Sequence, residues 1–160
     1  MNTYDLVRHA HADWSADENR PVSKRGQEDA FLVEDLLLDL PIDRIYSILF
    51  RLAIQNISPL AQHLELPITT VCDLRERRLG DFTNSDFLAA VQDTWTDPEF
   101  VHPGGESNRA AQRRARSFIN QLQPQNENAH IVLSTHGNLM ALLLNSFDRS
   151  IDFQFWRSLT

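Results

Sequence analysis

The chain has 160 residues, 42% hydrophobic and 23% charged, which suits one compact domain over residues 1–160 and excludes a largely disordered chain. A net charge of −7 without a basic stripe argues against nucleic-acid binding, and the longest apolar run, residues 140–144, is too short to cross a membrane. The lone cysteine, Cys72, excludes an internal disulfide and a paired-cysteine zinc site. We therefore expect a soluble, cytoplasmic protein.

Strand and helix patterns alternate along the chain. In order, we expect a strand at 4–7, a helix at 24–40 capped by Ser23, a strand at 44–49, a helix at 53–64, a strand at 68–71, helices at 86–95 and 106–122, a strand at 131–134 and an apolar helix after residue 138. This alternation predicts an α/β fold: a single three-layer domain with a mostly parallel sheet flanked by helices. In the first helix, the helical period predicts a core-facing stripe of Ala30, Leu32, Val33, Leu36, Leu37 and Leu40.

Two of the predicted strands end at a histidine. Arg8 and His9 follow the first strand, and His136 follows the last strand. Because ligands of open α/β sheets bind beyond the carboxyl ends of the strands, we expect both histidines near one site. A neutral imidazole can attack phosphorus, Arg8 can hold phosphate oxygens, and His136 can add a charged donor. The alternative is that both histidines only hydrogen-bond the backbone.

Two further segments carry candidate functional groups. Glu76 lies among arginines in residues 74–78, where burial would make it a general acid and exposure would leave it in a salt-bridged turn. Residues 103–107, Pro-Gly-Gly-Glu-Ser, precede a predicted helix, and their free N–H groups favour an anion unless the segment only begins the helix. That helix also carries a basic cluster, which we interpret as a solvated face: Arg109, Arg113, Arg114 and Arg116.

In this order, these segments resemble the histidine phosphatase (phosphoglycerate mutase-like) superfamily along nearly the whole chain. Residues 6–10, Leu-Val-Arg-His-Ala, are similar to its Arg-His-Gly motif, with Ala10 in place of the glycine. Residues 74–77 with Gly80 resemble its acid-bearing segment, and residues 103–107 resemble its Gly-Gly-Glu-Ser segment. Residues 134–138, Ser-Thr-His-Gly-Asn, resemble its second histidine motif.

The resemblance implies a phosphomonoesterase of the histidine acid phosphatase type, a hydrolase that uses neither a metal nor an organic cofactor. His9 would attack phosphorus and become phosphohistidine, Arg8 and His136 would bind phosphoryl oxygens, and Glu76 would protonate the leaving oxygen and then assist water. The partner would be a small phosphorylated substrate or a phosphopeptide, and His11 and Asn138 are expected at the pocket. A metal hydrolase lacks a ligand pattern such as His-x-x-x-His, and the sequence does not fix the oligomeric state.

The chain departs from the family in the segment that carries a second phosphate-binding arginine. Aligning Ser47, Ala53 and Gln55 with that segment puts Leu52 where the arginine belongs, with Arg51 one position early. A lost arginine would weaken the enzyme, and Leu52→Arg would then raise its activity. Two alternatives stay open: Arg51 takes over the phosphate, or the protein is a catalytically impaired pseudo-enzyme that binds phosphate or a phosphopeptide.

Overall fold

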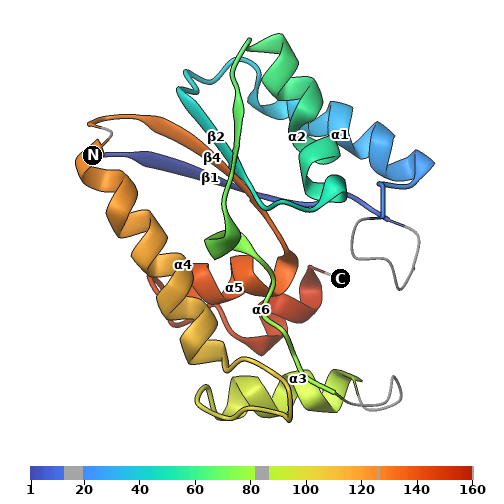
Figure 1. Ribbon diagram of the computed structural model, residues 1–160, viewed down its shortest axis with the longest axis vertical. Helices are drawn as coiled ribbons and strands as arrows, with labels where there is room; N and C mark the ends of the chain where they lie inside the picture. The colour runs from blue at the N-terminus through green and yellow to red at the C-terminus, as the bar shows by residue number, and fades with distance from the viewer. Residues whose placement is uncertain (13–19, 82–86, 126, 160) are drawn as a thin grey trace. The chain divides into compact units, whose positions relative to one another are not determined.

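The computed structural model describes residues 1–12, 20–81, 87–125 and 127–159 (Figure 1). The chain forms two compact units, which we describe separately. The first, called the sheet unit, comprises Met1–Arg75 and Leu122–His136. The second, called the helical unit, comprises Glu76–Gln121 and Gly137–Thr160. No helix among the described residues is long and apolar enough to cross a membrane.

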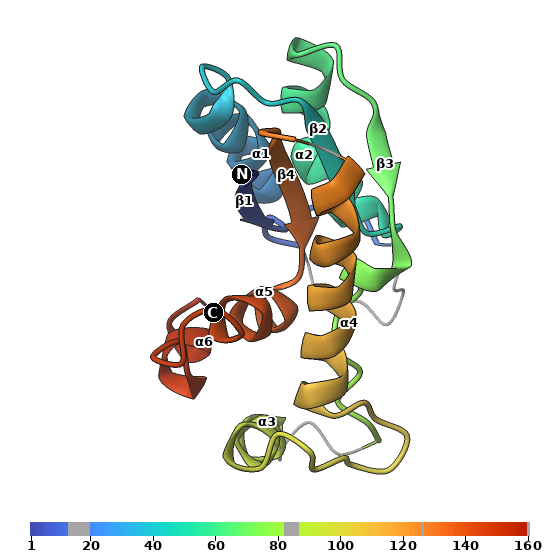
Figure 2. The ribbon, with the colours of Figure 1, turned by 90° about the vertical axis from the view of Figure 1, so that its left-hand side faces the viewer.

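The sheet unit is built on four strands, shown from two sides in Figures 1 and 2. They are β1 (Thr3–Arg8), β2 (Arg44–Ser47), β3 (Ile68–Thr70) and β4 (His130–Thr135). The spatial order is β1-β4-β2-β3, and every neighbouring pair is parallel. The predicted α/β class, with a parallel sheet flanked by helices, is therefore confirmed.

Two helices cover this sheet within the same unit. Helix α1 (Lys24–Leu37) packs against α2 (Arg51–His63), and α2 packs against β2, β3 and β4. Ser23 caps α1 as predicted, because its hydroxyl accepts a hydrogen bond from the Gly26 N–H at 3.1 Å. A Cβ atom at position 26 would lie 2.1 Å from the His11 carbonyl oxygen, so only glycine fits there.

The predicted core stripe of α1 is partly wrong. Leu32 and Leu36 are 59% and 78% exposed, whereas Ala30 is buried and Val33 and Leu37 pack against the core. Because successive helical residues differ in direction by about 100°, a helix lying on a single neighbour buries a narrow stripe, here residues 26, 30, 33 and 37. The sequence pattern of α1 is broader than this stripe, since it places leucines on the outer side as well.

Helix α2 has a sharper division between its buried and exposed sides. Its buried residues recur in pairs every four positions: Leu52, Ala53, Asn56, Ile57, Leu60 and Ala61. The helix begins two residues earlier than expected, so both Arg51 and Leu52 are helical. Arg51 is exposed, while Leu52 is only 1% exposed and belongs to the core-facing stripe. A side chain at position 52 therefore enters the interior.

The helical unit contains α3 (Phe87–Thr96), α5 (Gly137–Asn145), α6 (Phe153–Ser158) and most of α4 (Asn108–Leu122). The sequence did not predict α6. Asp152 begins this helix by accepting hydrogen bonds from the Gln154 and Phe155 N–H groups. Trp156 then fills an apolar cluster with Val91 and Ala141, which places the C-terminal aromatic segment in the core of this unit.

Burial of position 52 leads to a prediction about the stability of Leu52→Arg, the variant for which the sequence alignment predicts higher activity. Leu52→Arg should lower the free energy of unfolding by about 3 kcal/mol or more, because a guanidinium must be desolvated or the stripe of α2 displaced. Urea unfolding monitored by circular dichroism measures this change. Gln62→Arg, which places the same side chain at an exposed position of the same helix, is the matched control and should change stability by less than about 0.5 kcal/mol. A Leu52→Arg protein as stable as the parent would contradict the core assignment.

Candidate active site

The structure brings the two strand-end histidines side by side, as the sequence predicted. Because β1 and β4 pair in parallel with Arg8 opposite Thr135, the next residue of each strand leaves the same edge of the sheet. The His9 N–H continues the ladder by donating to the Thr135 carbonyl at 3.0 Å. The imidazole rings of His9 and His136 then meet edge to face, with their centroids 4.7 Å apart and their planes at 75°.

The hydrogen bond of His9 selects the tautomer that a nucleophile needs. Its Nδ1 lies 2.9 Å from the Ala10 carbonyl oxygen. A carbonyl only accepts hydrogen bonds, so Nδ1 must carry the proton and Nε2 holds the lone pair when the ring is neutral. Burial lowers the pKa of His9, opposed by the bond to Ala10 and assisted by the charges of Arg8 and Arg20. His9 is therefore neutral near pH 7, with Nε2 available to attack.

His136 is held still more strongly in its neutral form. Burial, followed by the neighbouring His9 and the charge of Arg20, lowers the pKa of His136 to about 3. The expected charged donor is thus a neutral ring in this structure, because its surroundings are apolar or cationic. The Phe50 ring covers it at a centroid distance of 5.7 Å. Within the described part of the chain, its buried Nε2 has no hydrogen-bond partner, which leaves this atom free for a ligand.

Three residues near this pair were not found by sequence reasoning. Arg20 acts electrostatically on both histidines, and Phe50 contacts the His136 ring. Asn56 is fully buried, and its Nδ2 donates to the Arg8 carbonyl at 3.1 Å, so it fixes the end of β1. Only Asn56 left a signal in the sequence, as a polar residue within the apolar stripe of α2.

The two arginines proposed for phosphate binding are both exposed. Arg8 ends β1, directly before His9, and its charge acts on the His9 ring. Arg51 is the first residue of α2 and directly follows Phe50, which touches His136. Leu52 points away from such a role because its side chain is in the core. Of the two adjacent positions, 51 is therefore the one that can present a guanidinium to an anion.

Glu76 belongs to the helical unit, where it caps the first turn of α5. Its carboxylate accepts hydrogen bonds from the N–H groups of Arg77, Asn138 and Leu139 at 2.8, 3.1 and 2.9 Å. Burial raises the pKa of Glu76, while these bonds and the Arg77 charge oppose the shift. A carboxyl group with a raised pKa can keep a proton for delivery, which suits a general acid.

The two possible pocket residues have structural partners. Asn138 is buried, and its Oδ1 accepts a hydrogen bond from the Trp95 indole N–H at 3.3 Å. His11 is exposed, with its Nδ1 at 2.7 Å from the hydroxyl of Ser23, the cap of α1. Both contacts hold helices in place, and a role of either residue at a substrate pocket remains a prediction.

The Pro-Gly-Gly-Glu-Ser segment is a helix start rather than an anion site. The N–H groups of Gly105 and Glu106 donate to the carbonyls of His102 and Arg78, at 2.9 and 2.7 Å. The Ser107 hydroxyl accepts from the Ala110 N–H at 3.0 Å and so begins α4. Of the two alternatives, the structure favours the helix start, because carbonyl groups of the same unit use the N–H groups of Gly105 and Glu106.

Comparison with known proteins places this histidine pair in a family. The profile of the histidine phosphatase superfamily (branch 1) matches residues 5–160. The chain belongs to this superfamily. The uncharacterised phosphatase PhoE of Bacillus subtilis is 22% identical over 150 residues, which cover 90% of this chain and 76% of that protein. Membership of the histidine phosphatase superfamily supports phosphatase activity.

Solved structures of phosphatases share the fold. A mycobacterial glucosyl-3-phosphoglycerate phosphatase, solved with inorganic phosphate, has a TM-score of 0.77 at 24% identity, covering 90% of this chain and 77% of that chain. The alpha-ribazole phosphatase from Shigella flexneri has a TM-score of 0.71 at 22% identity, covering 88% and 77%. At these identities the likeness establishes the phosphoglycerate mutase-like fold.

The depressed pKa of His136 predicts a loss of stability in acid. The folded protein keeps the ring neutral down to about pH 3, whereas the unfolded chain takes up the proton below about pH 6.5, so stability rises with pH between these values. Between about pH 7 and pH 5, the free energy of unfolding of His136→Gln should therefore fall by about 1–2 kcal/mol less than that of the parent. Urea unfolding across this range measures the difference. The parent protein measured in the same buffers is the reference, and equal slopes for the two proteins would refute the assignment.

Proposed function

We propose that the protein is a phosphomonoesterase that forms a phosphohistidine at His9. The observation that carries the proposal is the tautomer of His9: its Nδ1–H donates to the Ala10 carbonyl, so Nε2 presents a lone pair beside the His136 ring. A neutral imidazole held in this way is a competent nucleophile toward phosphorus. Membership of the histidine phosphatase superfamily agrees with this chemistry.

The reaction proceeds in two displacements. In the first, His9 Nε2 forms a bond to phosphorus while the bond from phosphorus to the ester oxygen breaks, and Glu76 gives its proton to the departing oxygen. In the second, Glu76 takes a proton from water as the water oxygen attacks phosphorus. The bond between phosphorus and Nε2 then breaks, which releases inorganic phosphate and restores neutral His9. Neither a metal nor an organic cofactor takes part in these steps.

The phosphoryl oxygens are held by Arg8, Arg51 and His136, with Arg20 adding positive charge. The transferring group spreads negative charge over its oxygens, and fixed donors facing them stabilise the transition state. The exposure of Arg51 and the burial of Leu52 favour Arg51 as the second guanidinium. An anion beside His136 would also raise the pKa of this ring, so that binding recruits it as a charged donor.

The substrate is a small phosphorylated molecule. The names of two structural neighbours support this class, since one is a glucosyl-3-phosphoglycerate phosphatase and another is an alpha-ribazole phosphatase. A phosphopeptide is the alternative partner. A panel of phosphorylated metabolites and peptides distinguishes them through the specificity constant kcat/KM for each compound.

The roles of His9 and Glu76 predict a dependence on the leaving group. His9→Ala should abolish release of phosphate from every monoester. Glu76→Gln should lower kcat by about 100-fold for an alkyl phosphate, whose oxygen needs a proton, and by far less for p-nitrophenyl phosphate, whose leaving group is stable as an anion. Steady-state kinetics with both substrates measure the two effects, with the fold of each variant checked by circular dichroism.

Because Glu76 also caps α5, a purely structural role of this residue predicts a different result. If Glu76 only stabilises the helix, Glu76→Gln lowers turnover of both substrates equally, and the acid role is lost. Parent activity no higher than that of His9→Ala would identify a binding pseudo-enzyme.

The role of Arg51 is tested with Arg51→Ala. A fall in turnover of about 100-fold supports Arg51 as a phosphate ligand, and unchanged turnover contradicts it.

A further inference from the structure

A second set of basic groups lies in the helical unit, apart from the groups used in the proposed reaction. Four arginines line a hollow of about 540 Å³ between α4 and the turn that follows α5: Arg109, Arg113, Arg116 and Arg149. The sequence indicated a solvated cluster on one helix, but the structure changes its membership. Arg114 leaves it, because it makes two hydrogen bonds to the Glu106 carboxylate at 2.8 and 3.1 Å. Arg149 joins it from a different part of the chain.

The lining of this hollow is complementary to an anion. Its other residues are all uncharged and able to donate hydrogen bonds: Gln112, Ser117, Asn120 and Ser146. Among the described residues that line it, none is acidic, although the chain has 22 acidic residues against 15 lysines and arginines. Such a local excess of positive charge in an acidic protein attracts a compact polyanion.

Packing holds one of these arginines in place before any ligand binds. The Arg116 guanidinium lies over the Phe147 ring, 4.0 Å from its centroid. It also donates to the carbonyl and the hydroxyl of Ser146, at 3.2 and 3.1 Å. A guanidinium held by these three contacts loses little further freedom when an anion binds, which favours affinity.

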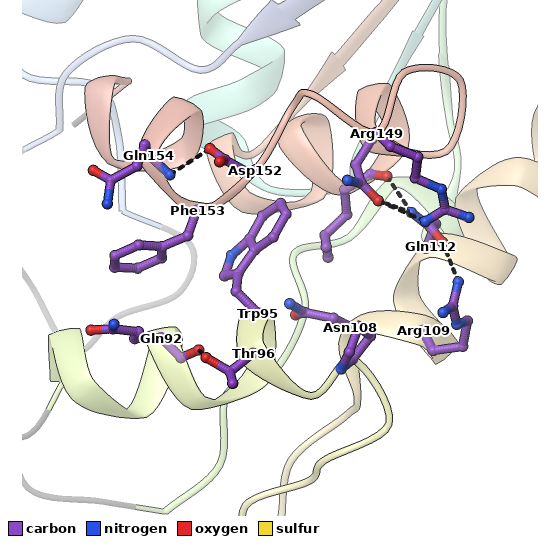
Figure 3. Close-up of a pocket in the computed structure, with 13 residues that line it drawn as sticks. Gln92, Trp95, Thr96, Asn108, Arg109, Gln112, Arg149, Asp152, Phe153 and Gln154 are labelled. Carbon is purple, nitrogen blue, oxygen red and sulfur yellow. Dashed lines mark hydrogen bonds between the residues drawn. The ribbon is translucent and has the colours of Figure 1, made fainter.

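A chain of hydrogen bonds positions two more of the four arginines. Arg109 donates to the Gln112 side chain at 3.2 Å, and Gln112 donates to the Asn145 carboxamide at 2.9 Å (Figure 3). Arg149 donates to the same oxygen of Asn145 at 3.2 Å. Gln112 is buried, so the network links the arginines of α4 and of the turn through the interior. The exposed contact of Arg109 with Glu99, at 3.4 Å, is weak enough for an anion to displace.

A second pocket adjoins the basic hollow and has a different character. This pocket, of about 360 Å³, shares Arg109, Gln112 and Arg149 with the hollow. Away from these residues, Trp95 of α3 and Phe153 at the start of α6 lie next to each other in the pocket (Figure 3). The site as a whole therefore offers cationic donors at one end and two aromatic side chains at the other, where Asp152 adds one carboxylate to the lining.

We propose that this site binds a nucleoside polyphosphate, with the phosphates among the four arginines and the base against Trp95 and Phe153. On a helix, Arg109 and Arg116 are separated by about 10 Å along the axis, a length that a chain of phosphates can cover. Charge-assisted bonds to phosphate oxygens and stacking on aromatic rings are the interactions that such a ligand uses. The net charge of −7 disfavours a long nucleic acid.

Calorimetric titration of the purified protein with ATP, tripolyphosphate and adenosine at low ionic strength tests the proposal. ATP should bind the parent and His9→Ala alike, tripolyphosphate more weakly, and adenosine not measurably. The double variant Arg113→Gln/Arg149→Gln should bind ATP about tenfold or more weakly, because two charged donors are lost. Lys24→Gln/Arg25→Gln removes the same charge from exposed positions of α1 and should bind ATP as the parent does.

Four results would overturn the proposal. The first two are that the parent does not bind ATP and that the two double variants bind ATP equally well. The other two are that tripolyphosphate binds as tightly as ATP and that a short DNA oligonucleotide binds more tightly than ATP. The hydrolysis of p-nitrophenyl phosphate should be unchanged in Arg113→Gln/Arg149→Gln. Failure of the binding experiment therefore leaves the proposed reaction at His9 unaffected, and the two proposals stand or fall separately.

Discussion

The parallel pairing of β1 with β4 is the constraint on which the candidate site depends. With Arg8 opposite Thr135, both strands end at the same level of the sheet, and the following residues face each other without any further adjustment of the chain. The His9 N–H prolongs the ladder by one hydrogen bond, which fixes the backbone of the proposed nucleophile. The buried carboxamide of Asn56 secures the preceding carbonyl from the side of α2. The histidine pair is thus held by regular secondary structure rather than by a loop.

The same placement sets the chemistry of the two rings. Both histidines are partly buried near the charge of Arg20, and the burial and this charge both favour the neutral form. A neutral ring has the lone pair that a nucleophile requires. The same surroundings lower the stability of the folded protein in acid, because they oppose protonation of the rings. In the proposed reaction, the phosphate supplies the opposite charge and shifts the electrostatic balance of the site toward protonated His136.

Patterns along the chain were sufficient to predict the fold and the histidine pair. Strands that end in Arg8-His9 and Thr135-His136 can be recognised from local periodicity, and the rule for parallel sheets then brings both ends together. The start of α2 could not be predicted as accurately. Phe50 begins the helix without a side-chain cap, so the sequence carries no signal for this start. The helix therefore begins two residues earlier than expected and includes Arg51 and Leu52, with Leu52 in the core.

Other features depend on tertiary contacts that leave no local pattern. Arg20 is far from His136 in sequence, and its influence on both histidines arises only from folding. Helix α6 is short, and its aromatic residues are equally compatible with a strand, so only the cluster around Trp156 reveals its environment. The basic cluster of α4 resembled a solvated face because Arg149, and the Asn145 side chain that links it to Gln112 of α4, come from outside that helix.

The central claim is that His9 accepts the phosphoryl group, and rapid quenching tests it most directly. The protein is mixed with a phosphomonoester labelled on phosphorus, quenched in base during turnover, digested and analysed by mass spectrometry. We predict one phosphoryl group per chain, on the peptide that contains His9, stable in base and lost in acid, and absent from His9→Ala. Turnover by the parent with a label on another residue, or with direct transfer to water and no labelled protein, would contradict the claim.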